Sequence, residues 1–334
     1  MSTSTASPTE RLVQIPGSEL RVPPMAVGTM GFGTTVPLET AHRLLDRAYA
    51  LGARFWDTAN NYAFWAPGGQ GGESEACLGA WLVSRGSAAR EEVVLASKVG
   101  AQPASPGGGL DDALGLSAPA VVAQVEASLR RLRVDALDMV YAHVDDTAVD
   151  LAETVGALQG LVQRGLTKTI AGSNLSALRL QAALEVAGDG PRYAALQDRF
   201  SYLLPRPGGD LDPHVLLDED LQQVCVDRDV LMLGYSPLLE GAYTRADRDL
   251  HPAYGTRSDH AAALQVLQRT SQDAGLDAGQ GVLAWMTQRP APVLPVVGVS
   301  RVEHVEQAWQ AVHTPLAADA VAALEQARMT APPQ

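Results

Sequence analysis

Residues 137–172 contain one complete strand–helix–strand unit. Residues 137–141 (LDMVY) and 169–172 (TIAG) are short apolar runs, and residues 151–164 between them (LAETVGALQGLVQR) carry apolar side chains at helical spacing. Gly165 directly follows the helical stretch, as is common where a helix ends. Such alternation of short strands with helices is typical of an α/β protein.

The same alternation extends along most of the chain and predicts eight strands. Eight strands, each followed by a helix, within about 300 residues is the number expected for a closed (β/α)8 barrel, the TIM barrel. We therefore predict the α/β class with this architecture. The predicted strands are Met25–Gly28, Arg54–Asp57, Val93–Ser97, Leu137–Tyr141, Thr169–Gly172, Ala194–Gln197, Val230–Gly234 and Val293–Val297. Examples of the predicted helices are Leu38–Leu51, Ala118–Arg133, Leu151–Arg164, Ser176–Ala187 and Glu219–Arg228.

Two segments lie outside this repeat. Leu12–Ile15 and Glu19–Val22 flank Pro16-Gly17, a turn signal that predicts a β-hairpin closing the bottom of the barrel. Ala317–Met329 predicts an extra amphipathic helix at the C-terminus. The sequence contains no linker long enough to divide it, which predicts a single domain over 1–334 with flexible tails at 1–10 and 330–334.

A doubly wound open sheet is the competing architecture. That fold normally carries a Gly-x-Gly-x-x-Gly fingerprint after its first strand. The candidate segment here is Gly28-Thr29-Met30-Gly31-Phe32-Gly33, and its glycines do not fit that spacing. The open sheet is therefore rejected in favour of the barrel.

Composition restricts the partners of this protein. The 334 residues include 25 basic and 38 acidic side chains, for a formal net charge of −13. Nucleic acids and anionic membranes attract clustered basic charge, so neither is the expected partner. Only Lys98 and Lys168 are lysine, and every other basic residue is arginine.

The cysteines and the apolar runs give two further expectations. Cys77 and Cys225 are far apart and form no metal-spaced cluster, so we expect two reduced thiols and no metal site. The N-terminal residues are polar, without the apolar region of a secretory signal. A typical apolar-rich run, Val230–Leu239, is half the length that a bilayer requires. These features predict a soluble, cytoplasmic protein.

Chemically active side chains follow three neighbouring strands. Asp57 ends the second strand and Tyr62 follows it, while Lys98 follows the third strand and His143 the fourth. The carboxyl ends of barrel strands share one face, so these groups are expected to converge there. The long stretches Ala63–Gly72, Ala101–Leu116 and Leu238–Ser258 also follow strand ends and place the expected active site at the same face.

The four residues form a set suited to proton delivery. A lysine cation lowers the pKa of a neighbouring tyrosine, and a carboxylate holds the cation in place. A neutral histidine orients a carbonyl oxygen, where negative charge develops during hydride addition. Each residue alone has an ordinary structural explanation, but burial of Lys98 without Asp57 would be costly.

The chain resembles an aldo-keto reductase from about Gly28 to Val312. Asp57-Thr58-Ala59-x-x-Tyr62, Ser97-Lys98 and His143 are similar to the family's catalytic motifs in order and spacing. The resemblance implies that Tyr62 is the general acid, that Lys98 and Asp57 tune it, and that His143 orients the substrate. It implies reduction of an aldehyde or ketone with NADPH.

The second half of the chain extends the resemblance. Ser173, Asn174 and Gln197 resemble the residues that hold the nicotinamide carboxamide, and Tyr235 resembles the tyrosine that stacks on the ring. Ser300 and Arg301 resemble the segment that grips the 2′-phosphate, so NADPH is preferred over NADH. The resemblance also assigns cofactor contacts to Gly28, Thr29, Met30, Asp57, Ser236, Pro237, Leu238, Gly241, Gly298, Glu306 and Gln307.

Several features depart from the family pattern. Ala63–Glu73 is inserted before Ser74-Glu75, Ala308 stands where the family has asparagine, and Phe200 replaces a frequent tyrosine. None of these departures involves the four catalytic candidates. The residues expected to line the substrate site are Phe64, Trp65, His143 and Tyr202, with Leu203, Tyr243 and Tyr254 as further candidates.

Two other functions compete with the reductase. The same fold could serve as an NADPH-binding regulatory or redox-sensing subunit, but a sensor would not require both Tyr62 and Lys98. In a metal hydrolase, His143, Asp145 and Asp146 would be the metal ligands, but no His-x-His pair supports this function. The expected partner is a small carbonyl compound, and the oligomeric state stays open.

Overall fold

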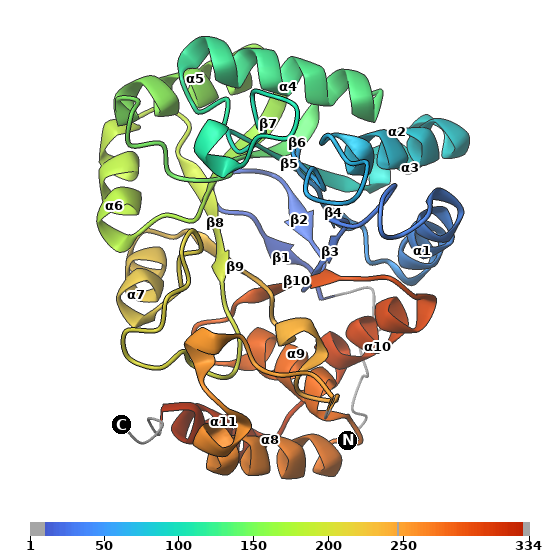
Figure 1. Ribbon diagram of the computed structural model, residues 1–334, viewed down its shortest axis with the longest axis vertical. Helices are drawn as coiled ribbons and strands as arrows, with labels where there is room; N and C mark the ends of the chain where they lie inside the picture. The colour runs from blue at the N-terminus through green and yellow to red at the C-terminus, as the bar shows by residue number, and fades with distance from the viewer. Residues whose placement is uncertain (1–10, 246, 330–334) are drawn as a thin grey trace, which may run out of the picture.

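The computed structural model describes residues 11–245 and 247–329, and shows a closed barrel of eight parallel strands (Figure 1). The predicted (β/α)8 architecture is confirmed. The barrel closes where Val297 of its last strand pairs with Val27 of its first. The strands are β3 (Ala26–Gly28), β4 (Phe55–Asp57), β5 (Val94–Val99), β6 (Leu137–Ala142), β7 (Thr167–Ser173), β8 (Tyr193–Arg199), β9 (Leu231–Tyr235) and β10 (Leu294–Gly298).

Helices surround this barrel on all sides (Figure 1). Their apolar faces pack on the strands in one large core. The α-helices are α1 (Leu38–Leu51), α2 (Glu73–Arg85), α3 (Ser87–Glu92), α4 (Ala118–Leu132), α5 (Leu151–Gln163), α6 (Ala177–Val186), α7 (Glu219–Asp227), α8 (Ala261–Asp273), α9 (Ala278–Gln288), α10 (Val302–His313) and α11 (Ala318–Met329). Short 3-10 turns are formed by Leu110–Asp112, Leu239–Gly241, Pro252–Tyr254 and Arg257–His260.

The predicted hairpin is present as β1 (Val13–Gln14) and β2 (Arg21–Val22), which pair antiparallel. Ile15 and Val22 are fully buried and belong to the same apolar cluster as the barrel interior. The hairpin therefore covers the amino-terminal end of the barrel, because its apolar side chains complete that core. The tails predicted at 1–10 and 330–334 lie outside the described residues.

The extra C-terminal helix, α11, is held by buried arginines. Arg289 forms an ion pair with Glu325 at 3.0 Å, and Trp285 donates its indole N–H to the same carboxylate. Arg328 is 5% exposed and donates to the main-chain oxygen of Tyr202 at 3.1 Å. These contacts attach α11 both to α9 and to the loop that follows β8.

Lys168, the second lysine, has a structural partner. Its ammonium lies 2.7 Å from a carboxylate oxygen of Asp138, which is buried at the amino-terminal end of the barrel. Arg90 donates to the other oxygen of that carboxylate at 2.8 Å. Lys168 thus helps to neutralise a buried charge at the barrel end opposite to the strand ends that carry the catalytic candidates.

Both cysteines are free thiols, as the sequence predicted. Cys77 lies in α2 and Cys225 in α7, and burial raises the pKa of each thiol to about 12. Such thiols are fully protonated at neutral pH and therefore unreactive. None of the helices in the described part of the chain has the length and apolar character needed to cross a membrane.

Candidate active site

Lys98 occupies the centre of the candidate site and is 1% exposed. Its ammonium donates to a carboxylate oxygen of Asp57, to the main-chain oxygen of Thr58 at 3.1 Å and to the phenol oxygen of Tyr62 at 3.1 Å. An ammonium has three N–H donors, so all of them are used. The sequence predicts that these residues converge at the carboxyl end of the barrel, and the structure shows this convergence.

Asp57 is held from two sides. It ends β4, it is fully buried, and its second oxygen accepts a hydrogen bond from the Gln197 amide at 2.8 Å. Gln197 comes from β8 and therefore reaches Asp57 across the barrel interior. This arrangement fixes the carboxylate that faces Lys98.

The pKa shifts follow from this geometry. Burial alone lowers the pKa of Lys98, but Asp57 and Tyr62 raise it and the net shift is upward, so the ammonium stays charged. Lys98 lowers the pKa of Tyr62, as the sequence predicts, but burial outweighs this effect and the net shift is upward. The phenol is fully protonated and available as a donor.

His143 lies beside the phenol. Its ring centroid is 5.8 Å from that of Tyr62 at an interplanar angle of 75°. The Nδ1 atom of His143 is buried and has no hydrogen-bond partner among the described residues. Burial, and then the charges of Lys98 and His214, lower the pKa of His143 well below its ordinary value. The imidazole is therefore neutral at neutral pH, as a group that orients a carbonyl oxygen should be.

We expect this histidine to make the fold sensitive to acid. Between its lowered folded pKa and the unfolded value of about 6.5, the folded chain binds fewer protons than the unfolded chain. The free energy of unfolding should therefore fall as the pH drops below about 6.5, by up to about 1.4 kcal/mol per pH unit for this one group. Urea denaturation between pH 7 and 5 measures it. A His143→Asn variant should show a shallower slope, whereas an identical slope would contradict the prediction.

The inserted loop contributes aromatic side chains next to the phenol. Trp65 is 51% exposed, and its ring centroid lies 6.3 Å from that of Tyr62. Phe64 packs edge-on against Trp65 at 5.1 Å. An exposed indole beside the catalytic candidate is consistent with a place in the wall of the substrate site.

Tyr202 does not line the mouth of the site, contrary to the prediction. It is fully buried, its ring packs edge-on against Trp285, and its hydroxyl donates to the main-chain oxygen of Ala263. Leu203, Tyr243 and Tyr254 are buried in the same core. The aromatic content after β8 and β9 serves packing, because α8, α9 and α11 cover these loops.

Ser173 and Gln197 lie together at the ends of β7 and β8. The Ser173 hydroxyl donates to the main-chain oxygen of Gln197 at 2.7 Å, and each side chain is nearly fully buried. The two residues that the resemblance assigns to the carboxamide thus lie next to each other. Gln197 also connects this pair to the catalytic candidates through Asp57.

The Asn174 side chain joins the ends of β6, β7 and β9 to the segment that follows β8. Its amide oxygen accepts from the Tyr235 hydroxyl at 2.7 Å and from the Val215 N–H at 3.2 Å. Its amide nitrogen donates to the main-chain oxygen of His143 at 3.0 Å and to the Ser173 hydroxyl at 3.2 Å. Two acceptor and two donor positions are the full capacity of an amide. In this conformation the side chain has none left for a cofactor.

The segment after β9 has the backbone of a tight turn. Ser236 and Gly241 have φ values of 53° and 88° in the left-handed region. Tyr235 is partly buried, and its ring faces that of His214 at 5.7 Å. Pro237 is buried and Leu238 partly buried, so this turn holds Tyr235 at the edge of the mouth.

The residues assigned to the 2′-phosphate are exposed. Ser300 and Arg301 precede α10, and the Arg301 guanidinium donates to the imidazole of His304 at 2.8 Å. A side chain built on Gly298 would meet no described atom within 4 Å, so the space beside it is open. The helix end therefore presents a guanidinium and a hydroxyl to an open surface.

Other assigned cofactor residues have protein partners. Glu306 forms an ion pair with Arg47 at 2.7 Å, and the main-chain oxygen of Gln307 accepts from Gln280. Thr29 is fully buried and donates to the main-chain oxygen of Asp57 at 3.0 Å, so it supports the site from below. Gly28 ends β3 and is buried, whereas Met30 is half-exposed.

Three residues of this neighbourhood were not identified from the sequence. Asp198 is fully buried under Asn174. Glu75 is fully buried between Ser97 and Arg131. The ring of His214 lies against that of Tyr235. Asp198 directly follows Gln197, and that adjacency was the available signal. His214 lies in the long segment between β8 and α7, well beyond the strand end, so no pattern pointed to it.

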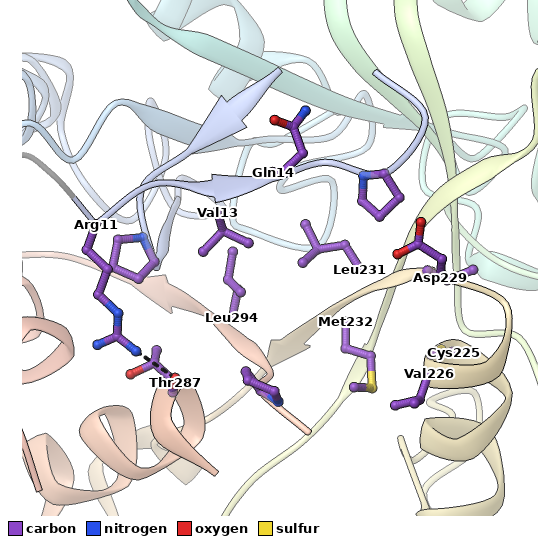
Figure 2. A pocket seen from close by; sticks show the side chains of 14 residues that line it. Arg11, Val13, Gln14, Cys225, Val226, Asp229, Leu231, Met232, Thr287 and Leu294 are labelled. Atoms are coloured by element: carbon purple, nitrogen blue, oxygen red, sulfur yellow. Dashed lines mark hydrogen bonds between the residues drawn. The ribbon is translucent and has the colours of Figure 1, made fainter. Parts of the chain in front are cut away.

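A pocket of about 340 Å³ lies away from these groups. It is found at the amino-terminal end of the barrel, between the hairpin, β9 and α7, and Figure 2 shows its mostly apolar lining of Val13, Leu231, Met232 and Leu294. The Arg11 side chain at its edge is engaged by the main-chain oxygen of Thr287. The chemistry of the strand ends is at the opposite face.

The sequence is similar to those of known reductases. A family model described as Aldo/keto reductase family matches residues 24–328. Norsolorinic acid reductase B of Aspergillus parasiticus is 29% identical over 339 residues, covering 93% of this chain and 82% of that protein. "Uncharacterized oxidoreductase YrpG" of Bacillus subtilis is 27% identical, covering 89% of each chain. "Aldo-keto reductase yakc [NADP(+)]" of Schizosaccharomyces pombe is 26% identical, covering 88% of this chain and 85% of that protein.

The family match extends over nearly the whole barrel, from the strand that begins it to the helix that ends the described chain. The fold agrees with it, since eight parallel strands close into a barrel with an N-terminal hairpin and a C-terminal helix. The resemblance noted in the sequence is therefore confirmed. This chain is an NAD(P)H-dependent oxidoreductase of the aldo/keto reductase family.

Proposed function

We propose that this protein reduces an aldehyde or ketone to an alcohol with NADPH, and that Tyr62 is its general acid. One observation carries the proposal. The buried ammonium of Lys98 divides its three donors between Asp57, Thr58 and the phenol oxygen of Tyr62. Because Lys98 donates to that oxygen, the phenol hydrogen is free to point toward a substrate.

The residues of the chain account for the proton half of such a reduction. A bound nicotinamide cofactor supplies the hydride. Tyr62 donates its proton to the carbonyl oxygen, where negative charge develops, and the cation of Lys98 stabilises the resulting phenolate. Neutral His143 orients the same oxygen through a ring N–H. Asp57 keeps Lys98 charged and in place.

The residues present fit a nicotinamide cofactor with a 2′-phosphate. Tyr235 offers a ring face at the mouth, and Ser173 and Gln197 offer polar groups beside it. Gly298 leaves open space next to Ser300 and Arg301, and a hydroxyl and a guanidinium are suited to a phosphomonoester. Glu306 does not contribute to this fit, because its carboxylate pairs with Arg47. Gln280 contacts Gln307 at the main-chain oxygen, and the Gln307 side chain is exposed.

The substrate class follows from the wall beside Tyr62. An exposed Trp65 packed against Phe64 favours a flat, aromatic carbonyl compound. One relative is named a norsolorinic acid reductase and another an aryl-alcohol dehydrogenase, which supports an aromatic panel. The test is a panel of aromatic and aliphatic aldehydes and ketones followed by loss of NADPH absorbance. Tight NADPH binding without turnover on any of them would favour the regulatory alternative.

Arg301→Ala is expected to weaken NADPH binding by about tenfold to a hundredfold and to leave NADH binding unchanged. A charge-assisted hydrogen bond is worth about 1.5–3 kcal/mol, and only NADPH carries the phosphate that forms it. Fluorescence titration with both cofactors measures the two dissociation constants. The exposed Arg43→Ala serves as a matched control, and equal weakening of both cofactors by Arg301→Ala would refute the role.

A further inference from the structure

Asp198 is a buried carboxyl group that the proposed reaction does not use. It is fully buried on β8, and since side chains alternate along a strand it faces away from the barrel interior that Gln197 enters. One oxygen accepts the backbone N–H of Asn174 at 2.5 Å. The other has no hydrogen-bond partner among the described residues, and the backbone N–H of Leu175 also favours the charged form of this carboxyl group, against burial, which raises its pKa. A buried polar group of this kind calls for a specific reason.

The residue that Asp198 contacts has an unusual backbone. Asn174 adopts a φ of 55°, in the left-handed region that asparagine enters more readily than most residues but still at some cost. The hydrogen bond from its N–H to Asp198 favours that conformation over the alternatives. This hydrogen bond thereby fixes the backbone conformation of the turn that leads from β7 into the loop before α6.

The direction of that turn decides where the Asn174 amide points. From this conformation the amide reaches the phenol of Tyr235 at 2.7 Å and the main-chain oxygen of His143 at 3.0 Å. It thus connects the proposed ring-stacking residue to the strand end that carries the proposed substrate-orienting residue. A rotation of the Asn174 backbone would break both contacts together.

We propose that Asp198 is a positioning residue of the active site, which acts through the left-handed Asn174 to hold Tyr235 and His143 in place. Asn174 is then a support for these two residues, with its amide saturated by protein groups. The inference rests on the proposed carbonyl reduction for its activity readout. A second readout, taken without any cofactor, is independent of that function.

Two variants of similar volume separate positioning from bulk packing. Asp198→Asn keeps an oxygen that accepts the Asn174 N–H, and Asp198→Leu does not. We expect Asp198→Asn to stay within about threefold of the parent in kcat and in the dissociation constant for NADPH. Asp198→Leu should lose about tenfold to a hundredfold in kcat/KM, because a buried N–H is left unpaired and the amide shifts. Equal impairment of both variants would overturn the proposal.

Hydrogen exchange of the ligand-free protein reads the proposed contact directly. The Asn174 N–H should be protected in the parent and in Asp198→Asn, and should exchange much faster in Asp198→Leu. Mass spectrometry of a peptide covering residues 170–180 measures it. Protection that is unchanged in Asp198→Leu would overturn the proposal whatever the activity. If the parent protein showed no NADPH-dependent turnover, the proposed function would be refuted, and the exchange result would still test the role of Asp198.

A double-mutant cycle tests the route through Asn174. Tyr235→Phe removes the same hydrogen bond from its far end, so its effect on NADPH binding and that of Asp198→Leu should not add. Additive losses would refute the route. If Asp198→Leu does not fold, Asn174→Gly takes its place in the cycle, because glycine adopts a φ of 55° without strain and only the amide is removed. A parental kcat/KM in Asn174→Gly would then overturn the proposal.

Discussion

Tyr62→Phe is expected to lower kcat for carbonyl reduction by about a thousandfold, within the range of about 10²–10⁴ that general acid catalysis contributes. The variant keeps the ring that faces His143 and Trp65 but loses the only proton that the phenol can deliver. Binding of NADPH should stay near the parental value, because the proposed cofactor contacts lie elsewhere. Single-turnover kinetics and fluorescence titration measure the two effects.

The matched control for this variant is Tyr49→Phe. Tyr49 has its hydroxyl bonded to Glu92 on the outside of the barrel, far from the strand ends that carry the site. Loss of that exposed hydrogen bond should leave kcat unchanged. Parental turnover in Tyr62→Phe would remove the assignment of the general acid, whatever the control shows.

Lys98→Met is expected to abolish turnover and to destabilise the fold by about 3–5 kcal/mol, as removal of one partner from a buried ion pair does. Asp57 would be left fully buried, and among the described residues its carboxylate would keep the hydrogen bond from Gln197. Urea denaturation gives the stability difference, and the NADPH assay gives the turnover.

The chain supplies its own control in Lys168→Met, the same substitution at its only other lysine. The Lys168 side chain is 59% exposed, and Asp138 would keep its hydrogen bonds from Arg90 and from the Leu95 N–H. We expect a loss of about 1 kcal/mol or less and parental turnover. Similar losses in the two variants would mean that Lys98 has no special place in the site.

The barrel and the convergence of the catalytic candidates could be predicted from the sequence for a simple geometric reason. Parallel strands of a barrel all end at one face, so residues placed just after successive strands must converge there. Asp57, Lys98 and His143 each lie at the end of a different predicted strand, and this position alone brings them together. Tyr62 follows Asp57 closely enough to share its location.

The failed expectations have an equally specific cause. Tyr202 follows a strand too, yet α8, α9 and α11 cover its loop and draw the ring into the core. The pKa of Tyr62 also depends on burial, which no local pattern reports and which outweighs the neighbouring cation. Asp198 was overlooked because its role depends on the turn at Asn174, which brings a backbone N–H to it.

The sequence by itself determined the repeat of strands and helices, the face on which the chemistry gathers and the identity of the groups there, because each depends on residues close together in the chain. Tertiary structure decided which groups are desolvated and which are already engaged. The three donors of Lys98, the saturated amide of Asn174 and the buried carboxyl of Asp198 are set by contacts between separate strands. Such contacts exist only once the barrel is closed.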